Sequence, residues 1–406
     1  MVVFEALNAL YGDCLLLRYK IGGQLSRIWI VDGGPRSGKV AGKPLSVWLD
    51  VLLPRLKEID DEQPLAVALG MVSHVDDDHI NGLERLTADL VAAQPLPGIV
   101  EFKRFWFNSF DAMLGPLPKA VAKPSAATPL AVAEVKAAFL ADGNASTEAQ
   151  AVLESIGQGI QLATNLQSLG LAGNSPVIGL VSAKPGQAAF SVDGASITVL
   201  GPLQSRLDKL RAKWVAALKN PTKSERTAAL QSLFATDTDL DASIPNLSSI
   251  VVLVDVAGKS LLLTGDARGD DIVAAWKELS LPDSRRKLDV LKVPHHGSFA
   301  NNPENFVRFF EATHYVFSAN GKYDNPDAPV VEGYVSVHFE RQITLHFTNN
   351  DIKWSKPYTM ARGGKLVHSL QDLLTEMKTA YAGPWQYNFR DPGKHSIEIE
   401  LPELST

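Results

Sequence analysis

The chain is almost devoid of cysteine. Its 406 residues include one, Cys14, which opens the apolar run at positions 14–17. A single thiol excludes an intramolecular disulfide, so folding does not depend on an oxidising compartment. We expect Cys14 to be a buried, inert core residue.

Long hydrophobic runs and a strong charge of one sign are also missing. No stretch approaches the roughly 18 continuous apolar residues of a membrane-spanning helix, and the N-terminus lacks the pattern of a secretory signal. The formal net charge of −6 argues against a surface that binds nucleic acid over its whole extent, although it permits a local basic groove. The expected location is cytoplasmic, without a membrane partner, and a homodimer remains open.

What the sequence does contain is strand-length apolar runs alternating with amphipathic segments. This alternation predicts an α/β protein with sheet covered by helices. We expect one domain over residues 1–406, with an alanine-rich helical insertion at 110–175 and a C-terminal extension of undetermined structure at 350–406. Outside the expected insertion, the expected strands are 2–7, 14–19, 27–31, 65–72, 249–256, 260–264, 288–293 and 314–318. The expected helices are 46–58, 80–91 and 270–279.

Histidine and aspartate side chains directly follow several of these strands. Asp32, the segment 74–79, Asp266 and the pair His295-His296 each stand at a strand end. Loops leaving one edge of a layered fold converge in space, and imidazole and carboxylate groups suit Zn, Mn or Fe. The alternative for residues 73–79 is a solvated acidic turn that caps the following helix.

The order of these segments resembles a known family. Residues 74–79 read His-Val-Asp-Asp-Asp-His, which resembles the metallo-β-lactamase signature H-x-H-x-D-H with Asp76 in place of the second histidine. The resemblance implies a four-layer αββα sandwich and a metal-dependent hydrolase. Further matching segments are 12–13, 32–34, 80–83, 262–266 and 291–298; the last, with 246–251, is similar to the hydrolase domain of ComEC-like DNA-uptake competence proteins.

The resemblance also implies roles for individual residues in a centre of two divalent ions. His74 and Asp76 would bind the first ion, Asp78 and His79 the second, and Asp266 would bridge both.

The double histidine adds one more ligand, and the sequence leaves open which of the two it is. The working assignment places His295 among the ligands and His296, with Asp78, among the catalytic groups. Asp32 would orient a ligand from outside the metal shell. Ser298 and Asn325 are expected to support the ligands or contact the substrate.

Three departures from the family pattern bear on the metals. Asp76 makes the first site harder, which favours Mn or Fe beside Zn. No histidine occurs at positions 80–294, where many members supply a ligand, and Asn325 stands where the branch has the histidine of Gly-His-Pro. Asp324 or Asp327 is a candidate to take its place.

Two ions of this kind would activate water for hydrolysis. The leading function is a phosphodiesterase or nuclease acting on a phosphoester or nucleic acid. The alternatives are a lactone or thioester hydrolase of the same fold, and a non-catalytic binding or regulatory module with a degraded metal site. Arg206, Lys209 and Lys213 would form a basic helix face able to hold phosphates, or an ordinary solvated face.

Overall fold

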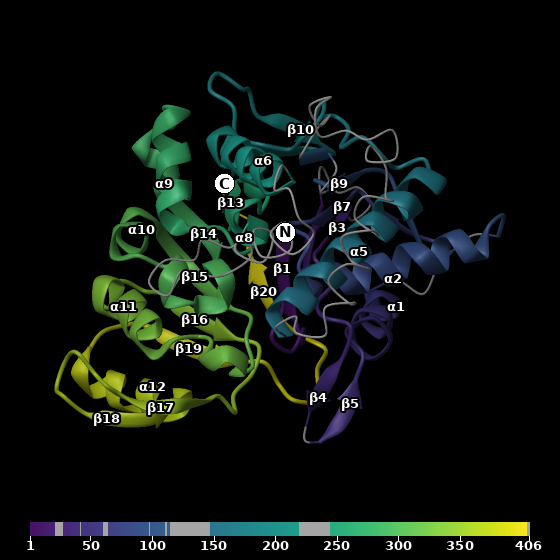
Figure 1. The fold of residues 1–406 in the computed structure, drawn as a ribbon. Helices are drawn as coiled ribbons and strands as arrows, with labels where there is room; N and C mark the ends of the chain where they lie inside the picture. The colour runs from purple at the N-terminus through teal and green to yellow at the C-terminus, as the bar shows by residue number, and fades with distance from the viewer. Residues whose placement is uncertain are drawn as a thin grey trace.

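The computed structural model describes residues 1–20, 27–40, 42–59, 64–96, 98–109, 112–113, 147–218 and 244–403. Two large β-sheets lie at the centre of the molecule and helices lie around them (Figure 1). The predicted α/β class is confirmed.

The first sheet contains six strands in the order β20-β1-β2-β3-β7-β9. The pairs β20–β1, β1–β2 and β2–β3 are antiparallel, whereas the pairs β3–β7 and β7–β9 are parallel. Side chains alternate between the faces, so Phe4 and Ala6 point to one side of β1 and Glu5 to the other. The bounds are β1 Val2–Leu7, β2 Leu15–Tyr19, β3 Arg27–Val31, β7 Leu69–Val72, β9 Phe105–Phe107 and β20 Ser396–Leu401.

The second sheet contains eight strands in the order β10-β11-β12-β13-β14-β15-β16-β19. The strands are antiparallel from β10 to β13 and parallel from β13 to β19. The bounds are β10 Phe190–Val192, β11 Ala195–Gly201, β12 Val251–Val256, β13 Lys259–Leu263, β14 Lys287–Lys292, β15 Glu311–Phe317, β16 Thr344–Phe347 and β19 Gln386–Phe389.

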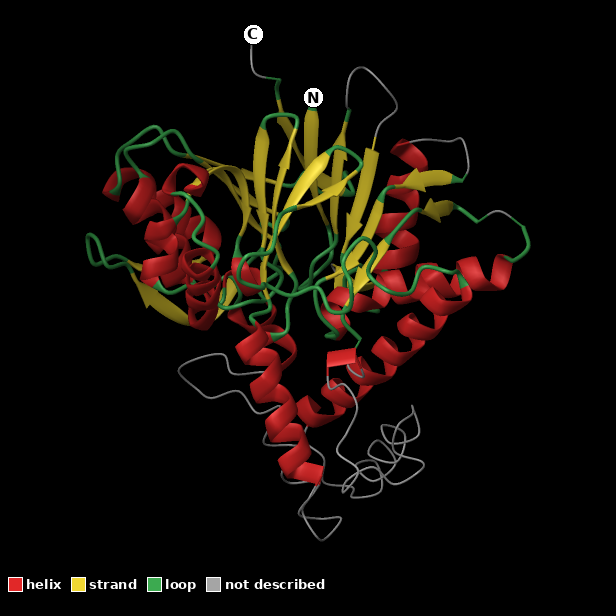
Figure 2. Ribbon diagram, turned by 90° about the horizontal axis from the view of Figure 1, so that it is seen from above, coloured by secondary structure: helices red, strands yellow, loops and turns green. Residues whose placement is uncertain are grey.

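The two sheets share one apolar core. Phe4 and Trp29 of the first sheet belong to the same buried cluster as Val252 and Val290 of the second. Figure 2 shows the strands in the middle of the molecule with helices on both sides. Burial of both sheet faces explains why many strands read as continuous apolar runs.

Helices pack on the outer face of each sheet. Trp48 and Leu83 cover the first sheet, and Trp276 and Tyr334 cover the second. The helices over the first sheet are η1 Val47–Leu52, α1 Leu53–Ile59, α2 Asp77–Ala93 and α5 Thr147–Ser168; those over the second are α9 Gly269–Glu278, α10 Glu304–Phe309, α11 Ala328–His338 and α12 Leu370–Ala380.

Of the expected insertion at 110–175, the structure describes residues 112–113 and 147–175. Its helix α5 packs along α2, where Asn165 Nδ2 donates to the Glu84 carbonyl at 3.2 Å and Gln158 Nε2 donates to Asp77 Oδ1 at 2.7 Å. Asp77 is the first residue of α2, so α5 supports the start of that helix.

The C-terminal segment 350–406 contributes strands to both sheets. Strand β19 pairs with β16 in the second sheet, and β20 pairs with β1 in the first. Between them and β16 lie α12 and a two-stranded hairpin, β17 Lys353–Thr359 with β18 Leu366–Ser369.

Cys14 lies in the hydrophobic core beneath the first sheet's helices. Cys14 is fully buried, and burial raises the pKa of its thiol well above the ordinary value, as expected of an inert thiol. In the part of the chain that the structure describes, no helix is both long and apolar enough to cross a bilayer.

Candidate metal centre

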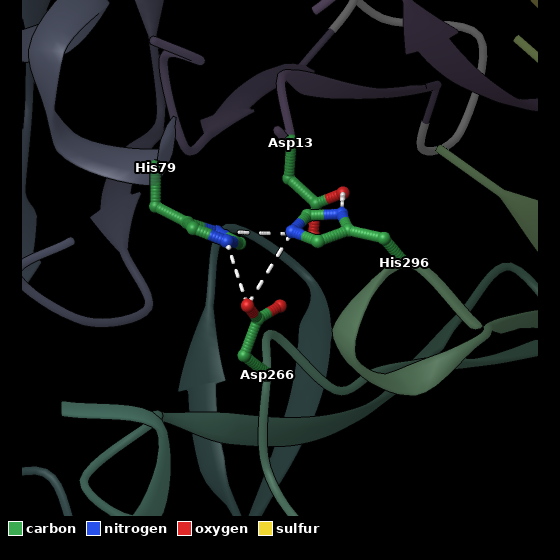
Figure 3. A group of neighbouring side chains, drawn as sticks. All are labelled: Asp13, His79, Asp266 and His296. Carbon is green, nitrogen blue, oxygen red and sulfur yellow. Dashed lines mark ion pairs between the residues drawn. The ribbon is translucent and has the colours of Figure 1, made fainter. Parts of the chain in front are cut away.

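Loops from both sheets meet at one edge of the strands. Asp13 lies in the β1–β2 connection, and His79 lies in the first turn of α2 after β7. Asp266 follows β13, and His296 follows β14. Ligand atoms of these four buried residues all lie within 4.8 Å of one another (Figure 3).

Glycines let the backbones of these loops approach closely. A Cβ on Gly12 would lie 1.9 Å from the carbonyl oxygen of Asp78, and one on Gly33 would lie 2.3 Å from the Leu83 nitrogen. Any other residue would push the Asp13 turn and the Asp32 turn away from α2. This explains why glycine accompanies the aspartates in segments 12–13 and 32–34.

Asp266 is the centre of the cluster. Its Oδ2 lies 3.9 Å from Nε2 of His74, 3.2 Å from that of His79, 3.5 Å from that of His295 and 3.4 Å from that of His296. Two ligands held at about 2.1 Å by one tetrahedral cation would be about 3.4 Å apart. The spacing therefore suits ligands that share a cation.

The first two histidines have their tautomers fixed by Asp32 and Ser73. His79 Nδ1 lies 2.9 Å from Asp32 Oδ2, so this nitrogen donates to the carboxylate. Ser73 Oγ also donates to Asp32, at 2.8 Å, and therefore accepts from His74 Nδ1 at 3.0 Å. A carboxylate that orients a histidine in this way is a frequent companion of metal-binding imidazoles.

The double histidine is oriented in the same sense. His295 Nδ1 lies 2.8 Å from Asn301 Oδ1, and the Asn301 amide nitrogen donates to the Asp266 carbonyl, which fixes the amide orientation. His296 Nδ1 lies 2.9 Å from the Ser318 carbonyl, which can only accept. All four histidines thus direct Nδ1–H outward and Nε2 towards Asp266.

The double-histidine turn has an unusual backbone. His295 and His296 both have positive φ, 45° and 53°. Such a conformation is unfavourable for residues other than glycine and is found at sites where the surroundings enforce it. Here the His295 amide donates to the Gly265 carbonyl at 3.1 Å, which ties the turn to the Asp266 loop.

The inward nitrogens are the reason for expecting a cation. Within the described residues, Nε2 of His74, His79 and His296 is buried and has no hydrogen-bond partner. Buried lone pairs facing a carboxylate are unfavourable unless a positive group lies between them. Because imidazole nitrogens and a carboxylate are ordinary ligands of Zn, Mn and Fe, these residues fit a metal ion.

The electrostatics of the cluster favour positive charge at its centre. Burial alone lowers the pKa of His79 and His296, but Asp266 and the carboxylates around it outweigh burial and hold both values well above the ordinary one. Burial alone raises the pKa of Asp266, but the neighbouring histidines keep it well below the ordinary value. The cluster therefore attracts a proton or a metal cation.

Asp76 and Asp78 lie at the partly exposed side of the cluster. Asp76 Oδ2 is 3.6 Å from His74 Nε2, and Asp78 Oδ2 is 3.4 Å from His296 Nε2. Asp76 occupies the N-cap position of α2 but makes no side-chain cap hydrogen bond. Its carboxylate thus faces the histidine, which argues against the alternative that this segment merely caps a helix.

Lys292 is a member of the cluster that the sequence analysis did not identify. It is fully buried, forms an ion pair with Asp13 and lies 3.9 Å from Asp266 Oδ1. Burial alone raises the pKa of Asp13, but Lys292 first and then His296 and His79 hold it far below the ordinary value. The sequence did contain a signal for Lys292, because a lysine at the buried end of the strand 287–292 requires a buried partner.

The remaining expected residues lie in the adjoining loops. The backbone carbonyl of Ser298 accepts a hydrogen bond from Asn302 Nδ2. The backbone carbonyl of Asn325 accepts one from the Gly321 amide. The two candidate substitutes for the missing histidine also hold loops: Asp324 accepts from the Ser355 amide at 2.8 Å, and Asp327 Oδ2 accepts from the Phe299 amide at 2.6 Å.

Two contacts lie farther from the cluster. Arg206 of α6 (Gln204–Leu218) forms an ion pair with Asp271 of α9 at 2.7 Å, so one member of the expected basic face is engaged within the protein. His314 and His346 contact each other at 3.0 Å on β15 and β16.

The fold and the cluster define an α/β protein with a buried Asp/His group that fits a metal ion. No family model matches the chain. A 94-residue segment is 32% identical to ComE operon protein 3 of Bacillus subtilis (strain 168), which corresponds to 23% of this chain and 12% of that protein. The chain therefore matches only a small part of that relative.

One solved structure is similar over most of the chain but at a low level. It is a protein of unknown function from Enterococcus faecalis V583, 12% identical, with 95% of this chain and 76% of that chain covered. Its TM-score of 0.28 is too low to support an argument about the fold.

Proposed function

We propose that this chain is a metal-dependent hydrolase with the four-layer αββα sandwich of the metallo-β-lactamase family. The observation that carries the proposal is the convergence of four imidazole Nε2 atoms on Asp266 Oδ2 at 3.2–3.9 Å. The two face-to-face sheets with helices on both outer faces support the fold assignment. The local similarity to ComE operon protein 3 is in keeping with the sequence resemblance.

We assign two divalent ions to the cluster. His74 and Asp76 would hold one, Asp78, His79 and His296 the other, and Asp266 would bridge them. His296 is assigned as a ligand because it is 3% exposed and its Nε2 lies 3.4 Å from both Asp78 and Asp266. The acidic ligands Asp76 and Asp78 favour Mn or Fe beside Zn.

His295 is then the histidine that can reach the substrate. Its side chain is 24% exposed, and Asn301 fixes Nδ1–H so that Nε2 faces the cluster. This reverses the working assignment made from the sequence, in which His295 was the ligand and His296 the catalytic group. In its protonated form His295 would stabilise charge on a leaving oxygen and donate a proton to it.

The metal ions would supply an acidified water and stabilisation of charge on the reacting oxygens. The chain's own residues prepare the place for them. Asp32 orients His79, Asn301 orients His295, and Lys292 balances the charge of Asp13. A phosphodiester is the favoured substrate because the segment 291–298 is similar to the competence-protein branch.

The direct test is hydrolysis of bis(4-nitrophenyl) phosphate by protein depleted of metal and reloaded with Mn or Zn. We expect metal-dependent hydrolysis, and a loss of kcat/KM in His74→Ala and Asp266→Ala beyond the roughly 10- to 100-fold that removal of an outer-shell partner costs. His368→Ala, an exposed histidine on β18, is the matched control and should retain activity.

Three other outcomes would contradict the proposal in different ways. Hydrolysis that persists in both site variants would remove the cluster from the reaction. Turnover of a thioester but not of the phosphodiester would change the substrate class. Full metal loading without hydrolysis of either compound would favour a binding or regulatory module.

A further inference from the structure

Two exposed aromatic side chains lie on loops that adjoin the candidate metal centre. Eight large hydrophobic side chains of the described residues are exposed, and the aromatic ones among them are Phe299, 63% exposed, and Tyr323, 77% exposed. Phe299 lies three residues after His296, and Tyr323 lies in the turn η5 (Lys322–Asp324) beyond β15. Large exposed rings next to a site often mark a binding surface.

The loop that carries Tyr323 is held in an unfavourable conformation. Tyr323 and Asp324 have consecutive positive φ values, 60° and 64°. The Asp324 carboxylate accepts hydrogen bonds from the amide and the hydroxyl of Ser355, which keeps the turn in place. Strain of this kind persists only where neighbouring contacts enforce it, and it is concentrated at functional sites.

A lysine lies between Tyr323 and a second tyrosine. Lys322 Nζ is 3.4 Å from the ring centroid of Tyr11 and 4.8 Å from that of Tyr323. The two rings meet edge to face, with centroids 6.5 Å apart. The group therefore offers aromatic surface and a positive charge in one place.

This group adjoins the metal-binding loops through the backbone. Tyr11 immediately precedes Gly12 and Asp13, and the Asp13 amide donates to the carbonyl of Asp78 at 3.1 Å. Burial, and then the nearby carboxylates of Asp77 and Asp78, raise the pKa of Tyr11 above its ordinary value, which reflects the same proximity.

Phe299 is tied to the other side of the double-histidine turn. Its amide donates to Asp327 Oδ2 at 2.6 Å, and the Asp327 amide donates to the carbonyl of Gly297 at 3.0 Å. These bonds fix the Phe299 backbone next to the double-histidine turn.

We propose that Phe299 and Tyr323 are stacking surfaces for nucleobases, with Lys322 beside the connecting phosphate, so that the proposed hydrolase acts on single-stranded nucleic acid. Single strands alternate planar bases with negative charges, which aromatic rings and a lysine complement. A compact lactone offers no second planar group for a separate aromatic surface. The inference rests on the proposed hydrolase function for its reaction, but base binding is measurable without turnover.

The test is equilibrium binding of a fluorescein-labelled oligothymidylate with phosphorothioate linkages, compared with an abasic strand of the same length and charge. We expect the metal-loaded protein to bind the thymidylate about tenfold more tightly, which corresponds to about 1.4 kcal/mol. Phe299→Ala and Tyr323→Ala should each lose part of this preference, and the double variant should lose nearly all of it. Phe299→Tyr and Tyr323→Phe should retain it, because the ring is preserved.

Leu366→Ala is the matched control. Leu366 is 58% exposed but lies on β18, outside the loops of the site. Equal binding of the two strands by the unaltered protein, or a preference that survives in the double alanine variant, would overturn the proposal. Phosphodiester hydrolysis without base preference would reject stacking alone, whereas base preference without hydrolysis would reject the proposed function alone.

Discussion

The two carboxylate oxygens of Asp266 have different surroundings. Oδ2 faces four imidazole nitrogens, whereas Oδ1 lies 3.9 Å from the ammonium of Lys292. Lys292 itself is paired with Asp13, and all three residues are buried. The Asp13–Lys292 ion pair therefore places two opposite charges, which neutralise each other, beside the metal-binding face. We infer that Asp13 primarily neutralises Lys292 and is not a primary metal ligand.

This arrangement predicts strong coupling between Lys292 and Asp13. Lys292→Met leaves a buried carboxylate without its counter-ion, which should lower the free energy of unfolding by about 3–5 kcal/mol. Adding Asp13→Asn to the same chain removes that charge and should recover much of the loss. Urea unfolding in the presence of a chelator measures both without a contribution from metal.

The control for this cycle is Lys353→Met, because Lys353 is 76% exposed and its removal strands no buried charge. Additive losses in the double variant would contradict the assigned pairing.

Among the secondary-structure elements, β1 is linked to its neighbours by a buried carboxylate. Glu5 on the outer face of β1 accepts from Arg18 of β2 at 2.6 Å, from Arg55 of α1 at 2.7 Å and from Ser396 of β20 at 2.8 Å. Burial alone raises the pKa of Glu5, but the two arginines outweigh it and leave the value below 4.5. The ionised form is therefore favoured by folding.

The lowered pKa of Glu5 predicts the pH dependence of stability. Because its folded pKa is depressed, its contribution is complete above about pH 4.5 and is lost as the pH falls through the folded value. Glu5→Gln should therefore be less stable than the unaltered protein at pH 7, and the difference should shrink below pH 4.5. Denaturant unfolding between pH 3 and 7 measures it, and parallel curves would contradict the prediction.

The elements were predictable where the pattern was local. The apolar runs 249–256 and 260–264 correspond to β12 and β13, and the helix expected at 80–91 corresponds to α2. Pairing of β20 with β1 was not predictable, because it joins segments nearly 400 residues apart whose contact depends on the whole fold. The same holds for Asn301 and His295, whose contact depends on the shape of two loops.

At the site, the residue types and their convergence were foreseen and the supporting contacts were not. Strand-end position was enough to bring His74, His79 and Asp266 together, because loops at one sheet edge converge. Burial of Lys292 and the loop-holding roles of Asp324 and Asp327 depend on contacts between loops. Sequence spacing carries no record of such contacts.

At the scale of the whole molecule, the candidate metal centre lies where loops of the two sheets meet. His74 and His79 follow β7 of the first sheet, and Asp266 and His296 come from loops of the second. A cation held by all of these loops would join the two sheets at the edge where their strands end. Metal binding would therefore stabilise the entire fold and not only the loops.

The measurement that tests the central claim most directly is the metal content of protein purified without added metal. We predict about two equivalents of Zn, Mn or Fe, as in two-metal hydrolytic sites. His79→Ala should lose most of this metal, and His368→Ala should keep it. Circular dichroism would establish that both variants are folded, and a chelator should lower the melting temperature of the unaltered protein but not that of His79→Ala. Metal content near zero that neither Zn nor Mn restores, or equal content in His79→Ala, would contradict the metal centre.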